Sequence, residues 1–481
     1  MTWRRPLGAA LILFLAGCAG PADRLQREIS RGGAVTLPPE AVELKKPLVI
    51  PPGTEVELTG TADSVLHAAP EFQGQALILC RDCKRVKMRG FSVEGAESGP
   101  SQLPVEAPPE NVARGRHFNS NGILIDNGED VEISGVRFRG LPGYAVVGAG
   151  SRRVKVENVS VSGGGSRNLR GKSNGSGGIV FEDGSTGIEV RNSRFEKISG
   201  HGISTAARPT AQRNGNLVFE NNEFNLTGRS AIHIGSSNRV RVLNNRIKFA
   251  GYPAEVVENE VGAASAAISS SGKVDEGVIR GNRIEEVNGY CFYLNGFHDG
   301  AVEGNECVNR GKPEEYPLGA YGIWFGNLSA EMRSQLNRVE SNLIEGMRLG
   351  GVFLVGSGHK ILNNRFLKLN MAQCPDQRAR NGCDLMPSEP GVVRAGVFIG
   401  DKAERPDPAT GNVVEGNQIS GYNMKANCVI LADKVDAAAN VVRGNTCLDV
   451  MAAAPAENPM SLKDRGTNEY ELFKPSDMFR K

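Results

Sequence analysis

One short phrase recurs along this chain of 481 residues and restricts its fold more than any other feature. Residues 217–224 read LVFENNEF, and residues 240–247, which start 23 positions later, read VRVLNNRI. Both alternate apolar and polar residues, as a short strand with one buried face does. Repetition at such a period indicates a stacked repeat. Further copies lie at 277–284, 300–307, 337–344, 359–366, 412–419 and 440–447, with looser copies at 131–138, 154–161 and 188–195.

The sixth position of the phrase is asparagine in eight copies. An asparagine after a strand tolerates left-handed backbone geometry and suits a tight bend. If the repeats stack, these amides fall into one column, where each can bond the rung above and the rung below. The eight are Asn222, Asn245, Asn282, Asn305, Asn342, Asn364, Asn417 and Asn445.

Rungs of about 22 residues, rich in Gly and Asn and built from short strands, are typical of a parallel β-helix. Over roughly 34–448 the chain resembles the right-handed parallel β-helix proteins of the pectate-lyase-like superfamily. The resemblance implies an all-β, single-stranded solenoid with loop insertions. It leaves the activity open, because one fold hosts many functions. The formal net charge of +2 gives no reason to expect nucleic acid as a partner.

The first residues are typical of a targeting segment. Arg4 and Arg5 precede an apolar run at 9–16 that is too short to span a bilayer. The run ends in Leu15-Ala-Gly-Cys18, which resembles the bacterial lipoprotein signal, and implies a signal peptide at 1–17 and a lipid on Cys18. Ala19 implies sorting to the outer membrane, on either its periplasmic or its surface face. The alternative is an ordinary secretory signal with an incidental cysteine.

The remaining chain divides into three parts. Residues 18–33 should hold the lipidated terminus and a helix around Leu25 and Ile29 that caps the first rung. Residues 34–448 form the solenoid, and 449–481 a C-terminal tail or cap. Insertions at 162–177, 248–264, 308–320 and 367–394 follow the same corner, so we expect them to stack as a wall of loops on one side.

Eight further cysteines in an exported chain favour disulfides. Cys307 should stack over Ile284, close to Cys291 around one corner, and Cys428 and Cys447 repeat that relation. Cys80 and Cys83 could instead hold zinc, although no second Cys or His pair lies nearby. The predicted pairs are Cys80–Cys83, Cys291–Cys307, Cys374–Cys383 and Cys428–Cys447.

A second strand follows each asparagine phrase, and its middle residue should point outward. Trp324, Phe353 and Phe398 hold this position in consecutive rungs and are predicted to stack on sugar rings. The alternative is that the insertion at 367–394 covers them as core, because exposed apolar stripes are uncommon. The expected column is Val146, Val180, Ser204, His233, Ser269, Tyr293, Trp324, Phe353, Phe398 and Ile430.

The seventh position of the phrase should also point outward, and it is often arginine. Arginine binds carboxylates bidentately, so the row suits an acidic polysaccharide. The alternative is a solvated salt-bridge ladder with Glu223 and Glu306. The arginines are Arg137, Arg194, Arg246, Arg283 and Arg365, of which Arg194 and Arg365 are predicted to bind substrate.

Two short stretches, Gly200-His201-Gly202 and Arg246-Ile247-Lys248, are similar to motifs of the polygalacturonase family. That family also needs paired catalytic aspartates, which are not apparent, so we do not expect glycoside hydrolysis. Phe297-His-Asp299 is only a partial match to the mannuronan epimerase signature.

The reaction class that remains is removal of the proton next to a uronate carboxylate. This reaction needs a base for the proton, a cation to hold the carboxylate, and an acid for the leaving oxygen. We predict His233 as the base, Tyr293 as the acid, and Arg246 and Arg283 as the carboxylate clamp, although a surface histidine is more often a bystander. The first hypothesis is an envelope-anchored lyase or epimerase for acidic glycans. The second is a non-catalytic glycan-binding or structural lipoprotein. Catalysis, a calcium requirement and the oligomeric state stay open.

Overall fold

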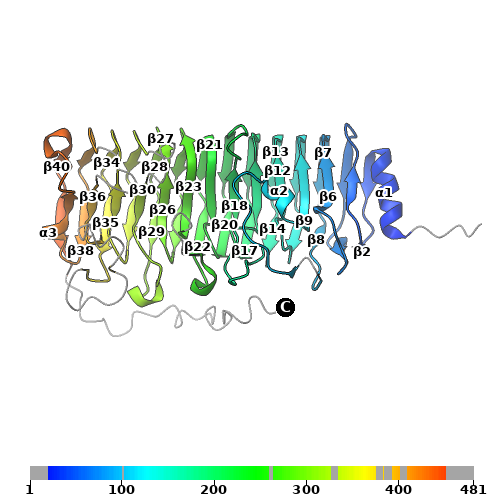
Figure 1. Cartoon of the computed structure of the whole chain (residues 1–481), viewed down its shortest axis with the longest axis horizontal. Helices are drawn as coiled ribbons and strands as arrows, with labels where there is room; N and C mark the ends of the chain where they lie inside the picture. Colours follow the sequence, from blue (N-terminus) through cyan, green and yellow to red (C-terminus); the bar gives the residue numbers. More distant parts are fainter. Residues whose placement is uncertain are drawn as a thin grey trace, which may run out of the picture.

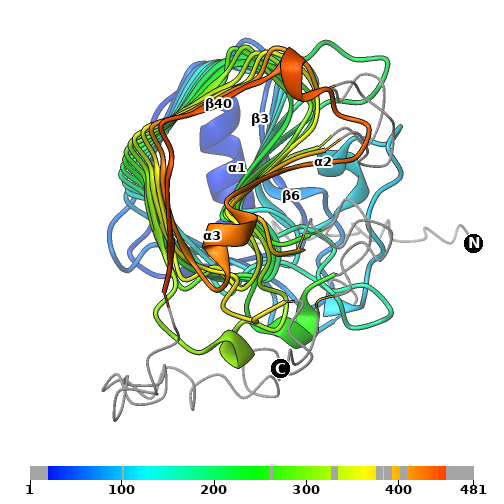
Figure 2. The ribbon, with the colours of Figure 1, turned by 90° about the vertical axis from the view of Figure 1, so that its left-hand side faces the viewer.

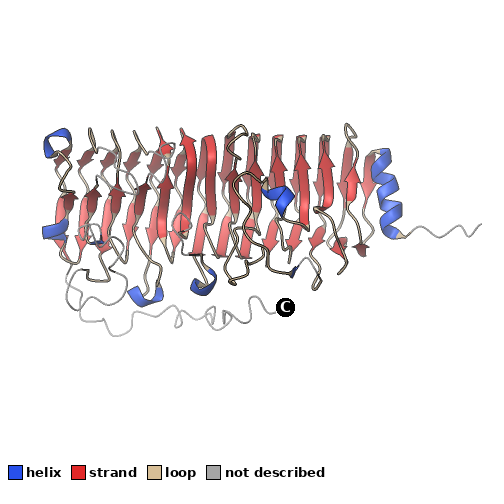
Figure 3. Cartoon of the chain, in the orientation of Figure 1, coloured by secondary structure: helices blue, strands red, loops and turns tan. Residues whose placement is uncertain are grey.

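The molecule is one continuous coil of stacked rungs, in which all strands of neighbouring rungs pair in parallel (Figures 1 and 3). The computed structural model describes residues 20–99, 102–258, 264–326, 334–374, 383, 393–400 and 409–450. Each rung has three sides, and Figure 2 shows them down the axis of the coil. Sides 1 and 2 belong to one 27-stranded sheet, because β21 (Ile232–Leu243) and β23 (Ala266–Asp275) run through the corner between them, and side 3 is a separate 14-stranded sheet.

The strands are short, as the alternating pattern predicts. Side 1 contains the starts of β21 and β23 with β3 (Leu48–Ile50), β6 (Ala76–Arg81), β9 (Asn121–Asp126), β12 (Val146–Ala149), β15 (Ile179–Glu182), β18 (Ile203–Ala206), β26 (Tyr290–Asn295), β30 (Ile323–Gly326), β33 (Val352–Leu354), β36 (Val397–Ile399) and β39 (Val429–Leu431). Side 2 contains β1 (Gly33–Thr36), β4 (Val56–Thr59), β7 (Lys84–Arg89), β10 (Glu129–Ser134), β13 (Arg152–Glu157), β16 (Thr186–Arg191), β19 (Asn214–Glu220), β24 (Val278–Arg280), β27 (Phe297–His298), β28 (Ala301–Glu303), β31 (Arg338–Glu340), β34 (Lys360–Leu362), β37 (Val413–Glu415) and β40 (Val441–Arg443). Side 3 contains β2 (Ala41–Leu44), β5 (Val65–Ala68), β8 (Ser92–Glu94), β11 (Arg137–Arg139), β14 (Ser160–Ser162), β17 (Arg194–Ile198), β20 (Glu223–Thr227), β22 (Arg246–Ala250), β25 (Arg283–Glu285), β29 (Glu306–Val308), β32 (Leu343–Glu345), β35 (Arg365–Leu369), β38 (Gln418–Gly421) and β41 (Thr446–Asp449).

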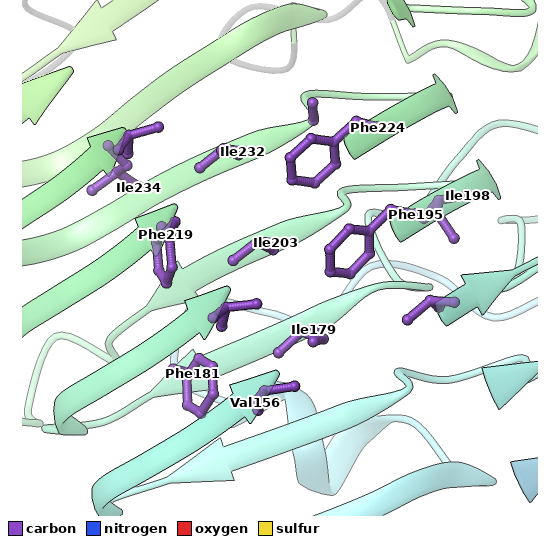
Figure 4. Close-up of a cluster of buried hydrophobic side chains, with 14 of the residues drawn as sticks. Val156, Ile179, Phe181, Phe195, Ile198, Ile203, Phe219, Phe224, Ile232 and Ile234 are labelled. Carbon is purple, nitrogen blue, oxygen red and sulfur yellow. The ribbon is translucent and has the colours of Figure 1, made fainter. Parts of the chain in front are cut away.

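The core is a set of columns of like side chains, one residue from each rung. Ile179, Ile203 and Ile232 lie in register in successive strands of side 1 and are fully buried (Figure 4). Across the core, the rings of Phe195 and Phe224 stack with centroids 4.9 Å apart. Parallel pairing in register therefore turns one apolar position of the repeat into a continuous apolar stack.

The asparagine column is confirmed. From Asn222 to Asn445, each side-chain Nδ2 donates to Oδ1 of the next asparagine at 2.9–3.1 Å, and each backbone N–H donates to the same Oδ1. The left-handed bend lies one position earlier than expected: Asn221, Asn244 and Asn363 have positive φ, and the sixth-position asparagines do not. The fifth position is the solvent-facing tip of the bend, whereas the sixth turns its amide inward.

The two described ends of the coil differ. At the start, helix α1 (Pro21–Arg31) buries Leu25 and Ile29 against the first rung, as predicted. Its Gln26 side chain donates to the Val49 carbonyl at 2.8 Å and accepts from the Val49 N–H at 2.7 Å, so the open edge of β3 is paired. In the last described rung, large apolar side chains remain exposed, namely Val441, Val442, Leu448 and Val450. The predicted tail and the predicted lipid site at Cys18 lie outside the described residues.

The four predicted disulfides are confirmed, including Cys80–Cys83, for which zinc was the alternative. Cα–Cα distances are 5.5 Å for Cys80–Cys83, 6.2 Å for Cys291–Cys307, 5.7 Å for Cys374–Cys383 and 5.8 Å for Cys428–Cys447. Cys307 pairs in register with Ile284, as the alignment of the rungs requires.

We expect Asn282→Ala to lower the stability of the solenoid strongly. The asparagine accepts from the Asn245 N–H at 2.9 Å and donates to the Val242 carbonyl at 3.0 Å, and both groups would be left buried and unpaired. The free energy of unfolding should fall by about 3 kcal/mol, since each buried unsatisfied group costs about 1–3 kcal/mol. Urea unfolding measures this loss, with exposed Asn119→Ala as control. Equal midpoints for the two variants would contradict the structural role of the ladder.

Candidate functional site

The loops between side 3 and side 1 gather on one flank of the coil (Figure 2). Besides the described parts of the four predicted insertions, residues 95–99 and 102–118 join this flank, and they contain helix α2 (Arg114–His117). Neighbouring loops bond one another: the Val105 N–H donates to the Arg167 carbonyl at 2.8 Å, and the Ser173 N–H to the Val256 carbonyl at 2.8 Å. The Tyr252 hydroxyl donates to the Glu315 carbonyl at 2.9 Å. The predicted wall of loops is therefore confirmed for the described residues, and it lies over side 1.

The outward residues of side 1 form a single register column beneath these loops. The predicted column is correct except at its first position, where Val147 replaces Val146. Val147 pairs with Val180, whereas Val146 points into the main core. The column reads Leu124, Val147, Val180, Ser204, His233, Ser269, Tyr293, Trp324, Phe353, Phe398 and Ile430.

Both apolar parts of the column are covered. Toward the N-terminus, Phe118 and Tyr144 pack edge to face, 5.5 Å between ring centroids, over Val147 and Val180. Toward the C-terminus, Trp324 and Phe353 stack at 3.7 Å, and Phe353 and Phe398 at 5.9 Å. The loop residues Leu349, Ala372, Cys374 and Val393 pack on these rings.

The aromatic rings are therefore part of a core and not an exposed stripe. Phe353 is 0% and Phe398 2% exposed, so neither presents a face to a sugar, and their predicted role in substrate binding is wrong. Trp324 keeps 8% exposure at the edge of the cluster. The alternative, cover by the insertion at 367–394, is what the described residues of that loop show.

Between the two apolar parts lies a polar cluster, in which Ser204, Ser230 and Ser269 are buried and the two histidines are half-buried. We call this cluster the histidine window: His201, Ser204, Ser230, His233, Ser269 and Ser271. Both ring nitrogens of His233 meet hydroxyls, Nδ1 with Ser269 Oγ at 2.8 Å and Nε2 with Ser271 Oγ at 3.0 Å. Ser269 Oγ also bonds Ser230 Oγ at 2.7 Å. A histidine with both nitrogens held in this way has a fixed ring orientation.

His201 was not among the predicted site residues. Its ring stacks on His233 with centroids 4.8 Å apart, and it bonds the backbone of Ser230. Its Nδ1 is buried and has no hydrogen-bond partner among the described residues. The flanking glycines allow this position, because a Cβ on Gly200 would lie 2.2 Å from the Gly175 carbonyl carbon, and one on Gly202 2.5 Å from the Phe224 ring. The Gly-His-Gly stretch was the sequence signal for this site.

Two arginines and one carboxylate surround the window. The Glu182 side chain is 2% exposed and accepts the backbone N–H groups of Arg114 at 2.8 Å and of Gly115 at 2.9 Å. These bonds hold helix α2 against side 1 next to the window, where a Cβ on Gly115 would lie 2.5 Å from Val147. Burial raises the pKa of Glu182. A Cβ on Gly175 would lie 3.6 Å from Arg229 Nη1 and 3.7 Å from His201 Nε2, so this guanidinium lies beside His201.

These surroundings keep the two imidazoles neutral. Burial, with the positive charges of Arg114 and Arg229 nearby, lowers the pKa of His233 to about 3. Burial, His233 and Arg229 lower the pKa of His201 well below its ordinary value. At neutral pH, the window therefore presents two uncharged rings beside two fixed cations.

The predicted catalytic residues do not meet in one place. Arg246 and Arg283 open strands β22 and β25 on side 3 and line a groove there, which His233 and Tyr293 do not enter. Arg194 lines the same groove, and Arg365 lies farther along side 3. The prediction that Arg246 and Arg283 form one site with His233 is wrong, because the bend at Asn244 turns the chain from side 2 onto side 3. The Arg246-Ile247-Lys248 motif likewise lies away from His201.

Tyr293 remains at the C-terminal edge of the window. It follows Ser269 in the register column and is 8% exposed. It lies two rungs beyond His233, at about 10 Å for a strand spacing of about 4.8 Å. Its ring packs against Tyr290, with centroids 4.8 Å apart.

Within the described stretches, no three His, Cys, Asp or Glu side chains gather closely enough to hold a metal ion. None of the helices described is long and apolar enough to cross a membrane. The window itself contains imidazoles and hydroxyls, with guanidinium groups beside it.

Known proteins share the fold and little sequence. A family model described as "Right handed beta helix region" matches residues 113–261, and no curated protein matches the sequence. Bacteriophage phi29 gene product 12 is similar with TM-score 0.57 and 11% identity over 86% of this chain; the match spans about half, 54%, of that protein. The catalytic unit of a Streptomyces thermodiastaticus alpha-1,3-glucanase is similar with TM-score 0.55 and 14% identity, and the match covers 85% of this chain and 67% of that one. PfbA, a surface adhesin of Streptococcus pneumoniae, is similar with TM-score 0.51 and 15% identity, and the match covers 72% of this chain and 86% of that one. The protein is a right-handed β-helix repeat protein.

Because Trp324 is buried, Trp324→Ala should destabilise the protein. Removal of a buried tryptophan leaves a cavity and costs about 3–5 kcal/mol. Thermal unfolding would show a clear fall in midpoint, whereas Leu169→Ala, at a side chain 77% exposed, should change little. A midpoint unchanged by Trp324→Ala would contradict the covered arrangement.

Proposed function

We propose that the protein binds an acidic, uronate-containing polysaccharide at the histidine window and removes the proton next to a carboxylate, as a lyase or an epimerase does. The observation that carries this proposal is a neutral, stacked histidine pair that lies beside two arginines and between the two apolar parts of the column. Titratable groups whose pKa values are strongly shifted from their ordinary values cluster at functional sites.

The two arginines supply the carboxylate site in this proposal. Arg114 and Arg229 replace Arg246 and Arg283 as the clamp, since they lie beside the histidines. His201 replaces His233 as the base, because its Nδ1 has no partner among the described residues, whereas both nitrogens of His233 are bonded. A neutral imidazole of low pKa is a weak base, so the guanidinium groups must also stabilise the negative charge that develops on the carboxylate.

The fate of the substrate then depends on the next step. In a lyase, the C–O bond at the neighbouring carbon breaks, and the leaving oxygen takes a proton; Tyr293 is the hydroxyl at that edge of the window. In an epimerase, the carbon takes a proton on its opposite face and no bond of the chain breaks. Proton removal by His201 is common to both.

The second candidate is a non-catalytic glycan-binding protein. The low basicity of the two histidines favours it, because the same window can hold a carboxylate without any proton transfer. Binding and chemistry must therefore be measured separately.

We expect polygalacturonate or polymannuronate to exchange its carboxylate-adjacent hydrogen for deuterium in D₂O in the presence of the protein, followed by NMR. Ultraviolet absorbance of an unsaturated product identifies a lyase, and sugar analysis identifies an epimerase. His201→Asn should slow exchange by about 10²–10⁴-fold, the contribution of a general base, and leave binding intact. Arg229→Gln should weaken binding, and His67→Asn on side 3 is the matched control.

Binding that depends on Arg229 without exchange would select the non-catalytic alternative. If no uronate polymer binds, with calcium or with a chelator present, the proposal fails in both forms. Exchange that persists in His201→Asn would exclude His201 as the base.

We also propose that the protein is held at the outer membrane by a lipid on Cys18. Cys18→Ala should abolish acylation and move the protein from the membrane to the soluble fraction, as intact mass and detergent partitioning would show. A variant that still fractionates with the outer membrane would contradict the anchor.

A further inference from the structure

The arginine row on side 3 lines a groove of its own. The groove has a volume of about 350 Å³ and crosses strands β17, β20, β22 and β25. This volume is within the range of small-ligand sites, roughly 300–1,000 Å³. None of the histidine-window residues lines it, so it is a separate site.

Two parallel columns of side chains run along this groove, and all of their members except Glu196 line it. Arg194, Glu223, Arg246 and Arg283 are in register in the first column, and Glu196, Asn225, Lys248 and Glu285 in the second. Arg194 pairs with Glu196 at 3.4 Å, and Arg283 with Glu285 at 2.9 Å. The predicted alternative, a ladder with Glu223 and Glu306, is therefore not what these arginines form.

Arg246 differs from its neighbours in the column. Its side chain is exposed, and its guanidinium has no ion-pair or hydrogen-bond partner among the described residues. It stands between Glu223 on one rung and Arg283 on the next. The centre of the groove thus holds an unneutralised cation with donors free for an anion.

Asn225 provides an independent sign of a missing ligand. Its Oδ1 is buried, lies in the groove lining and has no hydrogen-bond partner among the described residues. A buried amide oxygen without a partner costs free energy, so such groups call for an explanation. Asn225 pairs in register with Lys248, two residues beyond Arg246, which puts the two features diagonally across adjacent strands.

We propose that this groove is a second saccharide site, which binds one acidic sugar unit of a polymer. The guanidinium of Arg246 can bind an anionic group of the ligand, and Asn225 Oδ1 can accept a hydrogen bond from one of its hydroxyls. A neutral sugar has hydroxyls but no anionic group, whereas a carboxylate- or sulfate-bearing sugar has both. The site is argued from its own residues and stands whether or not the histidine window is catalytic.

The test is calorimetric titration of the whole protein with a carboxylated, a sulfated and an uncharged oligosaccharide of equal length. Arg246→Ala should weaken binding of at least one anionic ligand about tenfold, the effect of losing one charge-assisted contact, and the effect should shrink at high salt. Asn225→Asp should also weaken that ligand, because a like charge then faces its anion. Arg241→Ala is the matched control, an exposed arginine of the same rung on side 2.

Equal affinities for the wild type, Arg246→Ala and Asn225→Asp would overturn the proposal, as would an equal loss for the uncharged ligand. Circular dichroism and thermal unfolding of each variant establish that it is folded before its affinity is compared. Titration of Arg229→Gln separates the two sites. An affinity that depends on Arg246 and not on Arg229 supports saccharide binding in the groove and contradicts binding at the histidine window. An affinity that depends on Arg229 and not on Arg246 overturns the proposal for the groove and supports binding at the histidine window.

Discussion

The buried ladder of asparagine amides is the interaction on which the rest of the structure depends. Each amide bonds the next asparagine through its side chain and its backbone, and it also bonds a carbonyl of the previous rung, as Asn282 does with Val242. A shift of register by one residue would break these bonds in every rung from Asn222 to Asn445 at once. The ladder therefore fixes register, and register turns each position of the repeat into a column. Both sites described above are built on such columns.

The fold was predictable because alignment of the repeated phrases gives the register in which neighbouring rungs pair. Once the asparagine phrases are aligned, Cys307 falls over Ile284, and the disulfide to Cys291 follows from one rung of rise. The column of side 1 was also predictable, apart from the one-residue error at Val146. That error arose at a looser copy of the phrase, where apolar residues on both faces of the strand leave the alternation ambiguous.

The candidate site was less predictable, for two physical reasons. Alignment gives the position of a residue within a rung but not the direction in which its side of the coil faces, so Arg246 and His233 seemed close although a bend separates them. The insertions do not repeat, so their packing over Trp324 and Phe353 could not be read from the period. His201 lies in a corner outside the strand pattern and is found only through its flanking glycines.

The place of the histidine window follows from the same burial rule that forms the core. The column on side 1 is apolar at both ends, and the loops that cross it bury those ends, since an exposed stripe of rings and aliphatic groups would be costly. Ser204, His233 and Ser269 interrupt the apolar run and satisfy part of their polarity among themselves. They lie beneath polar rather than apolar neighbours, because Gly175 of the loop at 162–177 and Arg229 lie beside His201. A change from apolar to polar residues in one column thus places a polar cluster in a repeated scaffold. The loops beside that cluster, held by contacts such as that of Glu182 with helix α2, bring charged side chains close to it.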